Sequence, residues 1–288
     1  MRRFLALLSL VVTTVTGTQA LPPAPGCVIA EQVYGVDHAG DLIAQPFCAL
    51  PAGVDLPPRT LASFGAHVPQ LFFGGQLHDA TVVMYSVGAD GALRWYRESS
   101  ATGRLGPGVV VGSQFGDWRS YQYLHAADGD LSGVDAQGRL LRWEHSGWRN
   151  GGDTWGQPAP EDLGPICPGT RPVYTGRGEQ DVYVGVATHT PSYVYCGPTG
   201  QARVASVLPA GVTAVTMAAY PSVAYALRQG DSWLTRLRLD MSGATPQWRT
   251  DAVVRTAFSV IFTGQSICAE GAPLPKYEWQ WNWYGRYS

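Results

Sequence analysis

A unit of about fifty residues that recurs along the chain constrains its fold more than any other feature of the sequence. The most complete copy spans residues 112–164, where short apolar runs are separated by the turn pairs Asp128-Gly129 and Gln137-Gly138. Such pairs between short apolar runs are typical of successive antiparallel hairpins. A sheet of three or four short strands cannot bury a face alone, so each unit must stack against its neighbours.

The spacing of the copies indicates what this stack is. One strand recurs in every unit and aligns the positions Val36, Val87, Val134, Val186 and Ala226, with separations of 51, 47, 52 and 40 residues. These periods are close to the roughly 40–50 residues of β-propeller repeats. The first unit has no apolar strand in front of it, whereas a strand at 258–263 is left over at the far end. We therefore predict an all-β fold, a five-bladed β-propeller over residues 21–268 that is closed by a C-terminal strand completing the first blade.

The N-terminus indicates export. Residues 1–20 contain two arginines, an apolar run at 4–12 and a small polar end, which together predict a secretory signal peptide cleaved after Ala20. No later segment has about 18 uninterrupted apolar residues, so we expect a secreted, extracellular protein that is not an integral membrane protein. The net charge of −2 becomes more negative when Arg2 and Arg3 are removed, which argues against a nucleic-acid partner.

The five cysteines favour disulfides over metal binding. None has the C-x-x-C spacing of zinc or thioredoxin-like sites, and export favours oxidation. Closure of the ring would bring Cys27 and Cys268 to the same end of the first blade, so we predict that they pair. Cys167 precedes the first strand of the fourth blade and Cys196 lies in its third strand, so they form the second candidate pair, which leaves Cys48 over. We expect no metal and no cofactor, because Asp128-Gly129-Asp130 is too short for a calcium loop.

The unit at 111–164 also carries a set of aromatic and glycine positions in a fixed order. They are Val111, Gly112, Trp118, Tyr121, Tyr123, Leu124, Asp128, Gly129, Gly133, Val134, Trp155, Leu163 and Gly164. This pattern resembles the blade of the tachylectin-like β-propeller lectins. The unit at 64–111 matches it in part, and the last two units lack the first Trp. The resemblance implies a ring that binds glycans, namely N-acetylated or related sugars, at those blades where the site survives.

The candidate carbohydrate-binding residues lie in the most complete unit. Trp118 and Tyr121 offer apolar ring faces to a sugar, and Asp128, with Gly129 and Asp130 beside it, offers carboxylate oxygens to its hydroxyls. The alternative is that both aromatic residues pack between blades and that Asp128 only shapes a turn. The sequence leaves both interpretations open.

Catalytic motifs are scarce. The six histidines are scattered, and neither H-E-x-x-H nor G-x-S-x-G occurs. The segment WRNGGDTW at 148–155 is similar to the Asp-box turn of sialidase-like propellers at Asn150, Gly152, Thr154 and Trp155, but lacks the leading Ser and Asp. Such boxes stabilise turns and do not catalyse. We predict a secreted, non-catalytic carbohydrate-binding protein, and the alternatives are a sialidase-like glycoside hydrolase and a protein-interaction scaffold.

The C-terminal tail, residues 269–288, differs from the rest of the chain. In an extended strand, its alternation places Tyr277, Trp279, Trp281 and Trp283 on one face and Glu278, Gln280 and Asn282 on the other. An apolar face of this kind is either packed on the ring or used as an aromatic platform for a partner.

Overall fold

The computed structural model describes residues 29–48, 57–65, 69–77, 81–165, 170–174, 183–187, 192–196, 202–207, 209, 211–217, 223–240, 247–263 and 267–268. Within these residues the chain forms short strands and two single-turn 3-10 helices, η1 (Ser113–Phe115) and η2 (Trp118–Ser120). The strands are β1 (Ile29–Val36), β2 (Asp41–Cys48), β3 (Arg59–Ser63), β4 (Gln70–Gln76), β5 (Val82–Val87), β6 (Leu93–Arg97), β7 (Val109–Val111), β8 (Gln122–Ala127), β9 (Asp130–Val134), β10 (Arg139–Glu144), β11 (Glu161–Pro165), β12 (Thr170–Tyr174), β13 (Tyr183–Ala187), β14 (Ser192–Cys196), β15 (Ala202–Val207), β16 (Val212–Met217), β17 (Val223–Arg228), β18 (Trp233–Asp240), β19 (Gln247–Ala257), β20 (Val260–Thr263) and β21 (Ile267–Cys268).

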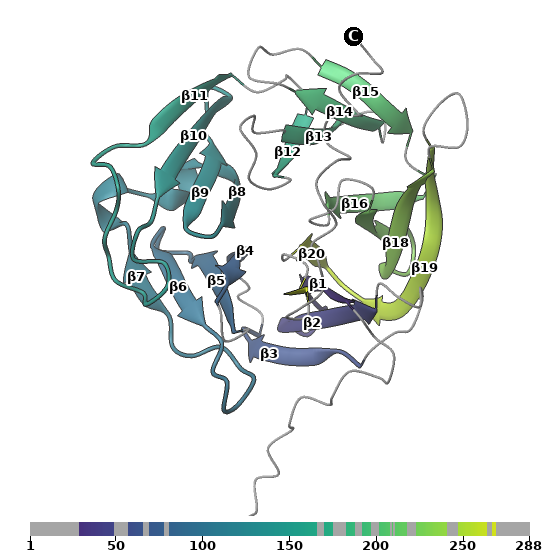
Figure 1. The fold of residues 1–288 in the computed structure, drawn as a ribbon, viewed down its shortest axis with the longest axis horizontal. Coiled ribbons are helices and arrows are strands. Elements are labelled where there is room, and N and C mark those ends of the chain that lie inside the picture. Colours follow the sequence, from purple (N-terminus) through teal and green to yellow (C-terminus); the bar gives the residue numbers. More distant parts are fainter. Residues whose placement is uncertain are drawn as a thin grey trace, which may run out of the picture.

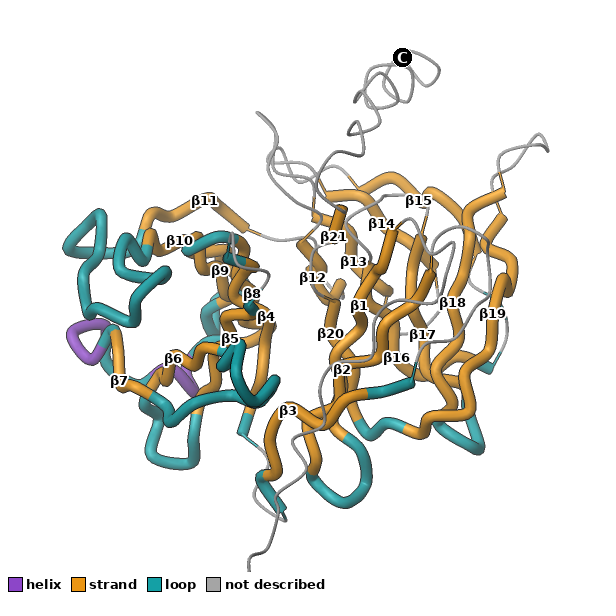
Figure 2. Tube along the Cα trace, turned by 60° about the horizontal axis from the view of Figure 1, so that its bottom comes forward, coloured by secondary structure: helices purple, strands orange, loops and turns teal. Residues whose placement is uncertain are grey.

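The strands form antiparallel sheets that follow one another around a ring (Figure 1). The first sheet has the order β20-β1-β2-β3, with β21 also paired to β1, and the others are β4 to β7, β8 to β11, β12 to β15 and β16 to β19. The innermost strands β4, β8, β12, β16 and β20 contact one another in that order, and β20 contacts β4 again. Figure 2 shows the ring tilted, with turns gathered beyond the strand ends. The predicted all-β class is confirmed.

Two of the hairpin turns are stabilised in the same way, by an aspartate side chain that accepts hydrogen bonds from the backbone of its own turn. The carboxylate of Asp37, between β1 and β2, accepts hydrogen bonds from the backbone N–H groups of Ala39 and Asp41, both at 2.9 Å. Asp135, between β9 and β10, accepts two bonds in the same way, at 2.9 and 2.8 Å. An aspartate that bonds its own backbone two residues ahead fixes a turn locally. The repeat that is visible in the sequence is therefore partly a repeat of turn chemistry.

The two ends of the described chain meet in the first sheet. β20 lies antiparallel to β1, with Val260 opposite Val36 and Thr263 opposite Val33. The backbone N–H of Ser259 donates to the carbonyl of Val36 at 2.7 Å, so the pairing begins at the very end of β1. This pairing agrees with the prediction that a C-terminal strand completes the first sheet.

Several predictions lie outside the described residues. They concern the signal peptide at 1–20, the tail at 269–288, and the two disulfides, because Cys27 and Cys167 are not among the described residues. The backbone register places Cys268 opposite Ile29. In the described part of the chain, no helix is long and apolar enough to cross a membrane.

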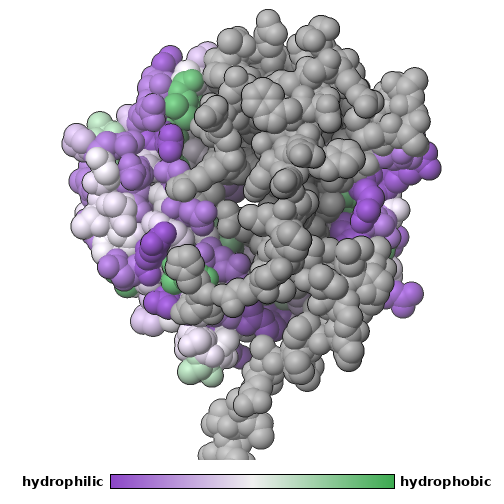
Figure 3. Space-filling model, viewed as in Figure 1, coloured by the Kyte–Doolittle hydropathy of each residue, from purple (hydrophilic) through white to green (hydrophobic). Residues whose placement is uncertain are grey.

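Apolar side chains fill the spaces between neighbouring sheets. On β1, Val33 packs toward the fifth sheet, whereas the next residue, Tyr34, packs toward the second sheet. β5 is buried on both faces in the same manner, with Met84 facing the first sheet and Tyr85 the third. Successive side chains of a strand point to opposite faces, so one strand serves two interfaces. The described outer surface over the second and third sheets is mostly hydrophilic, with small hydrophobic spots (Figure 3).

Candidate functional site

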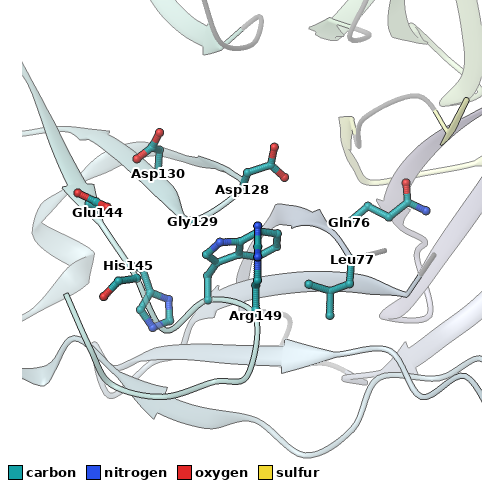
Figure 4. Close-up of a pocket in the computed structure, with 10 residues that line it drawn as sticks. Gln76, Leu77, Asp128, Gly129, Asp130, Glu144, His145 and Arg149 are labelled. Atoms are coloured by element: carbon teal, nitrogen blue, oxygen red, sulfur yellow. The ribbon is translucent and has the colours of Figure 1, made fainter. Parts of the chain in front are cut away.

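A pocket of about 440 Å³ lies between the second and third sheets. It is built from the end of β4, the turn between β8 and β9, and the segment that follows β10 (Figure 4). The residues that line it are Gln76, Leu77, Asp128, Gly129, Asp130, Glu144, His145, Ser146, Trp148 and Arg149. Three of the five predicted carbohydrate-binding residues, Asp128, Gly129 and Asp130, are therefore brought together here.

The turn between β8 and β9 presents these three residues to the pocket. Ala127 pairs with Asp130, and the two residues between them both have positive φ, 51° at Asp128 and 92° at Gly129. This is the backbone of a tight two-residue hairpin, for which Asp-Gly is a favoured pair. A Cβ on Gly129 would lie 2.3 Å from Cδ1 of Trp148, so only glycine lets the indole close against the turn.

Trp148 supplies the aromatic side chain of the pocket. Its side chain is only 8% exposed, and a Cβ on Gly75, from the neighbouring sheet, would lie 2.8 Å from its ring. The indole N–H of Trp95, on β6, donates to the carbonyl of Trp148 at 2.6 Å. The guanidinium of Arg149 lies 5.5 Å from the ring centre, a cation–π distance. The sequence interpretation assigned this residue to a turn motif and missed its place in the pocket.

His145 joins the pocket wall to the second sheet. Its Nε2 lies 2.8 Å from the carbonyl of Gly152 and its Nδ1 lies 2.7 Å from the hydroxyl of Tyr85. A carbonyl only accepts, so Nε2 carries the hydrogen and the Tyr85 hydroxyl donates to Nδ1. Burial lowers the pKa of His145 and raises the pKa of Tyr85, which favours the neutral form of both. His145 thus fixes the segment after β10 in place.

Acidic side chains gather on one side of the pocket. Asp130 on β9 and Glu144 on β10 are directly opposite in the register, so both point to the same face of the sheet. Arg142 Nη2 lies 3.1 Å from Asp130 Oδ2, and Arg142 Nη1 lies 3.8 Å from Glu161. Within the described residues, no three acidic, histidine or cysteine side chains are placed to hold a metal ion.

Trp118 and Tyr121 lie away from this pocket, in the core. Trp118 is 0% exposed, and its indole N–H donates to the carbonyl of Gly112 at 3.0 Å. Its ring centre lies 5.0 Å from that of Trp143, and the half-buried Tyr121 lies 4.8 Å from Trp143. A ring without an exposed face cannot stack on a sugar. The interpretation of Trp118 as a sugar-stacking residue is therefore corrected, and the packing alternative holds for it.

The segment that resembles an Asp box forms a turn. The side-chain oxygen of Asn150 accepts from the backbone N–H of Gly152 at 2.9 Å, in the place where the motif has Asp. The N–H of Gly147 donates to the carbonyl of Thr154 at 3.1 Å and closes the turn. Asp153 accepts from the N–H of Gly112 at 2.6 Å, which ties the turn to the end of β7. These contacts are structural and position Trp148 and Arg149.

Comparisons with known proteins do not assign the chain to a family. No family model and no curated protein matches it. Among solved structures, it is similar to a chain of a nidogen/laminin complex, at 13% identity and a TM-score of 0.43, covering 81% of this chain and 98% of that one. It is also similar to TolB from Acinetobacter baumannii (11%, TM-score 0.42, 80% and 54%) and to AofleA from Arthrobotrys oligospora (14%, TM-score 0.38, 66% and 58%).

These similarities assign neither a ligand nor a reaction to the chain, because the TM-scores and identities are low. The chain also spans only about half of the matched TolB and AofleA chains. The resemblance to tachylectin-like lectins therefore stays a prediction, and the functional conclusion has to come from the pocket.

Proposed function

We propose that this protein is a secreted five-bladed β-propeller that binds carbohydrate without catalysing a reaction on it. The cyclic order of contacts among the innermost strands and the pairing of β20 with β1 support the closed five-bladed ring. Its ligands are glycans or glycoconjugates, and the tachylectin resemblance points to N-acetylated or related sugars. Export rests on the signal-peptide pattern at 1–20.

The observation that carries the proposal is the composition of the pocket between the second and third sheets. Carboxylates of Asp128, Asp130 and Glu144 and the amide of Gln76 surround a cavity of about 440 Å³ whose wall includes the indole of Trp148. A concave site with one aromatic wall and a few convergent polar groups is typical of small-ligand pockets. Sugars present many hydroxyls, so they suit a concave site with several convergent carboxylates and an amide.

Binding of the mature chain to a panel of immobilised glycans tests the proposal, with Asp128→Asn as the variant. Asparagine tolerates the positive φ of this position, so the turn is retained while the negative charge is lost. We expect about a tenfold loss of affinity, the equivalent of one charge-assisted hydrogen bond. Asp135→Asn, the same change at the turn on the other end of β9, is the matched control and should bind as the wild type does.

One observation favours the hydrolase alternative. Asp130 and Glu144 face each other across β9 and β10, and glycosidases use a pair of carboxyl groups. Incubating the mature chain with the same glycans and analysing the products separates the two functions. Binding without products supports the proposed lectin-like function, release of sugar assigns a hydrolase, and the absence of any binding rejects a carbohydrate site.

A further inference from the structure

We propose that the sugar bound in this pocket carries a free amino group, so that the ligand is a cationic amino-sugar oligomer. This inference rests on the proposed carbohydrate-binding function, and for this pocket it replaces the N-acetylated sugars to which the tachylectin resemblance points by related sugars with a free amine. It follows from the charges of the described residues around the pocket and from the way in which they are arranged.

The lining is negatively charged. Three lining residues, Asp128, Asp130 and Glu144, carry carboxylates and one, Arg149, carries a guanidinium, so the formal charge of the lining residues is −2. The guanidinium of Arg142, next to the lining, pairs with Asp130 and brings the sum to −1. His145 adds no positive charge, because both of its ring nitrogens are used in the bonds to Tyr85 and Gly152 that the neutral form makes. A cleft lined by one sign of charge attracts ligands of the opposite sign and repels its own. Acidic sugars are therefore disfavoured here.

Two of the carboxylates, Asp130 and Glu144, also lie next to each other, which favours a cation between them. Asp130 and Glu144 are direct cross-strand partners, and like charges in that position destabilise a sheet. Arg142 approaches Asp130 at 3.1 Å and Glu161 at 3.8 Å, but among the described residues Glu144 has no ion pair. A positive charge on the ligand beside Glu144 would relieve this repulsion. A primary ammonium has three N–H donors to share among neighbouring carboxylates.

The two sides of the pocket differ in chemistry, so each side suits a different part of the ligand. Figure 4 shows Asp130 and Glu144 together on one side and Gln76 with Leu77 on the other. Arg149 lies over the indole of Trp148, so the one cation of the wall is placed at the aromatic part of the pocket. An amino sugar fits this division, with its ammonium toward Asp130 and Glu144 and its hydroxyls and ring toward Gln76 and Leu77.

Calorimetric titration of the mature chain with four matched oligomers tests the inference. The ligands are the hexamer of glucosamine, the same hexamer fully N-acetylated, cellohexaose and hexagalacturonate, and hexalysine is added as a cation without sugar. We expect the glucosamine hexamer to bind at least tenfold more tightly than its acetylated form, with an affinity that falls as salt is raised. Hexagalacturonate should bind most weakly.

The possible outcomes distinguish a failure of the amino-sugar inference from a failure of the proposed carbohydrate-binding function. Equal binding of the glucosamine, N-acetylated and cellulose oligomers would overturn the amino-sugar inference while keeping a carbohydrate site. Binding of none of the sugars would overturn both. Hexalysine binding as tightly as the glucosamine hexamer would show a site for cations in general, and would overturn the assignment to an amino sugar.

Glu144→Gln supplies the second readout, with Glu161→Gln as its control. Both side chains are exposed and belong to the same sheet, but only Glu144 lines the pocket. Glu144→Gln should weaken the glucosamine hexamer about tenfold and leave cellohexaose unchanged. It should also raise the Tm of the free protein by about 1–3 °C, because a like-charge pair is removed. An unchanged affinity for the glucosamine hexamer in Glu144→Gln would reject the inference.

Discussion

At the scale of single residues, Trp118 and Trp143 are the two largest side chains that the described structure buries completely. We predict that Trp118→Ala lowers the free energy of unfolding by about 3–5 kcal/mol, because it leaves a cavity among Phe115, Trp143 and Trp155. It also removes the indole donor of the Gly112 carbonyl. Urea unfolding of the mature chain measures the loss. An unchanged free energy of unfolding together with weakened glycan binding would contradict the packing role and show that Trp118 contributes to binding.

Two histidines make stability depend on pH. Burial lowers the pKa of His125 to about 4 and also lowers the pKa of His145. An unfolded histidine has a pKa of about 6.5, so as the pH falls the unfolded chain takes up protons before the folded chain does. Stability is therefore complete above about pH 6.5 and is lost as the pH falls toward 4, by at most about 3 kcal/mol for His125.

Chemical unfolding at pH 7, 6, 5 and 4.5 measures this slope. His125→Gln should remove part of it, because glutamine does not titrate. Several aspartates have pKa values lowered by hydrogen bonds from arginine, so they lose their contribution to stability only at lower pH; they are Asp90, Asp117, Asp162 and Asp231. A stability that is flat from pH 7 to 4.5 would show that neither histidine stays neutral in the folded chain.

The sequence could predict those site residues that a local rule places. Asp128, Gly129 and Asp130 form a two-residue hairpin whose turn chemistry is contained in the pair itself. Trp148 could not be found in this way, because its place depends on contacts with Gly75 of β4 and Trp95 of β6, about fifty or more residues away. The pattern around Trp118 shows an aromatic residue shortly before a strand, in the 3-10 helix η2. Such a pattern does not distinguish a residue packed between two sheets from a residue on the surface.

At the scale of elements, the β8–β9 turn and the β9–β10 turn of the third sheet differ in what packs against their glycine. Gly129 (φ 92°) is covered by Trp148, whereas Gly138 (φ 75°) has nothing within 4 Å of a built Cβ. We predict that Gly138→Ala costs about 1–2 kcal/mol, the strain of a positive φ alone. Gly129→Ala should cost a further 1–3 kcal/mol or so, because the methyl group collides with the indole.

Thermal unfolding of the two variants gives the difference directly, and binding of glycan to each gives its consequence. Gly129→Ala displaces Trp148 from the pocket wall and should weaken binding, whereas Gly138→Ala should bind normally. Equal losses of stability in the two variants would mean that Trp148 does not rest on the turn between β8 and β9.

At the scale of the whole molecule, the repeat period predicts the order of the sheets. The strand that the first unit lacks and the strand left over at 258–263 together predict the pairing of β20 with β1 that the structure shows. The contacts that hold neighbouring sheets together were not visible in the sequence. The ion pair of Arg59 and Glu98 between the first and second sheets, at 2.5 Å, joins residues 39 positions apart. No period in the sequence encodes such a pair.

The pairing of β20 with β1 makes the last part of the described chain a part of the first sheet. Removal of residues 258–288 takes away β20, β21 and the buried Phe258, which packs with Val33 and Phe47. It also leaves β1 without its partner strand from Val33 to Val36, where β20 pairs, and at Ile29 and Ala30, where β21 pairs. We predict that this truncated chain does not give a cooperative unfolding transition and aggregates on refolding. Removal of residues 269–288 alone, which leaves every described strand in place, is the control and should unfold cooperatively. A soluble, cooperatively unfolding chain that ends at residue 257 would show that the first sheet does not need β20, and that the two ends of the chain do not close the ring.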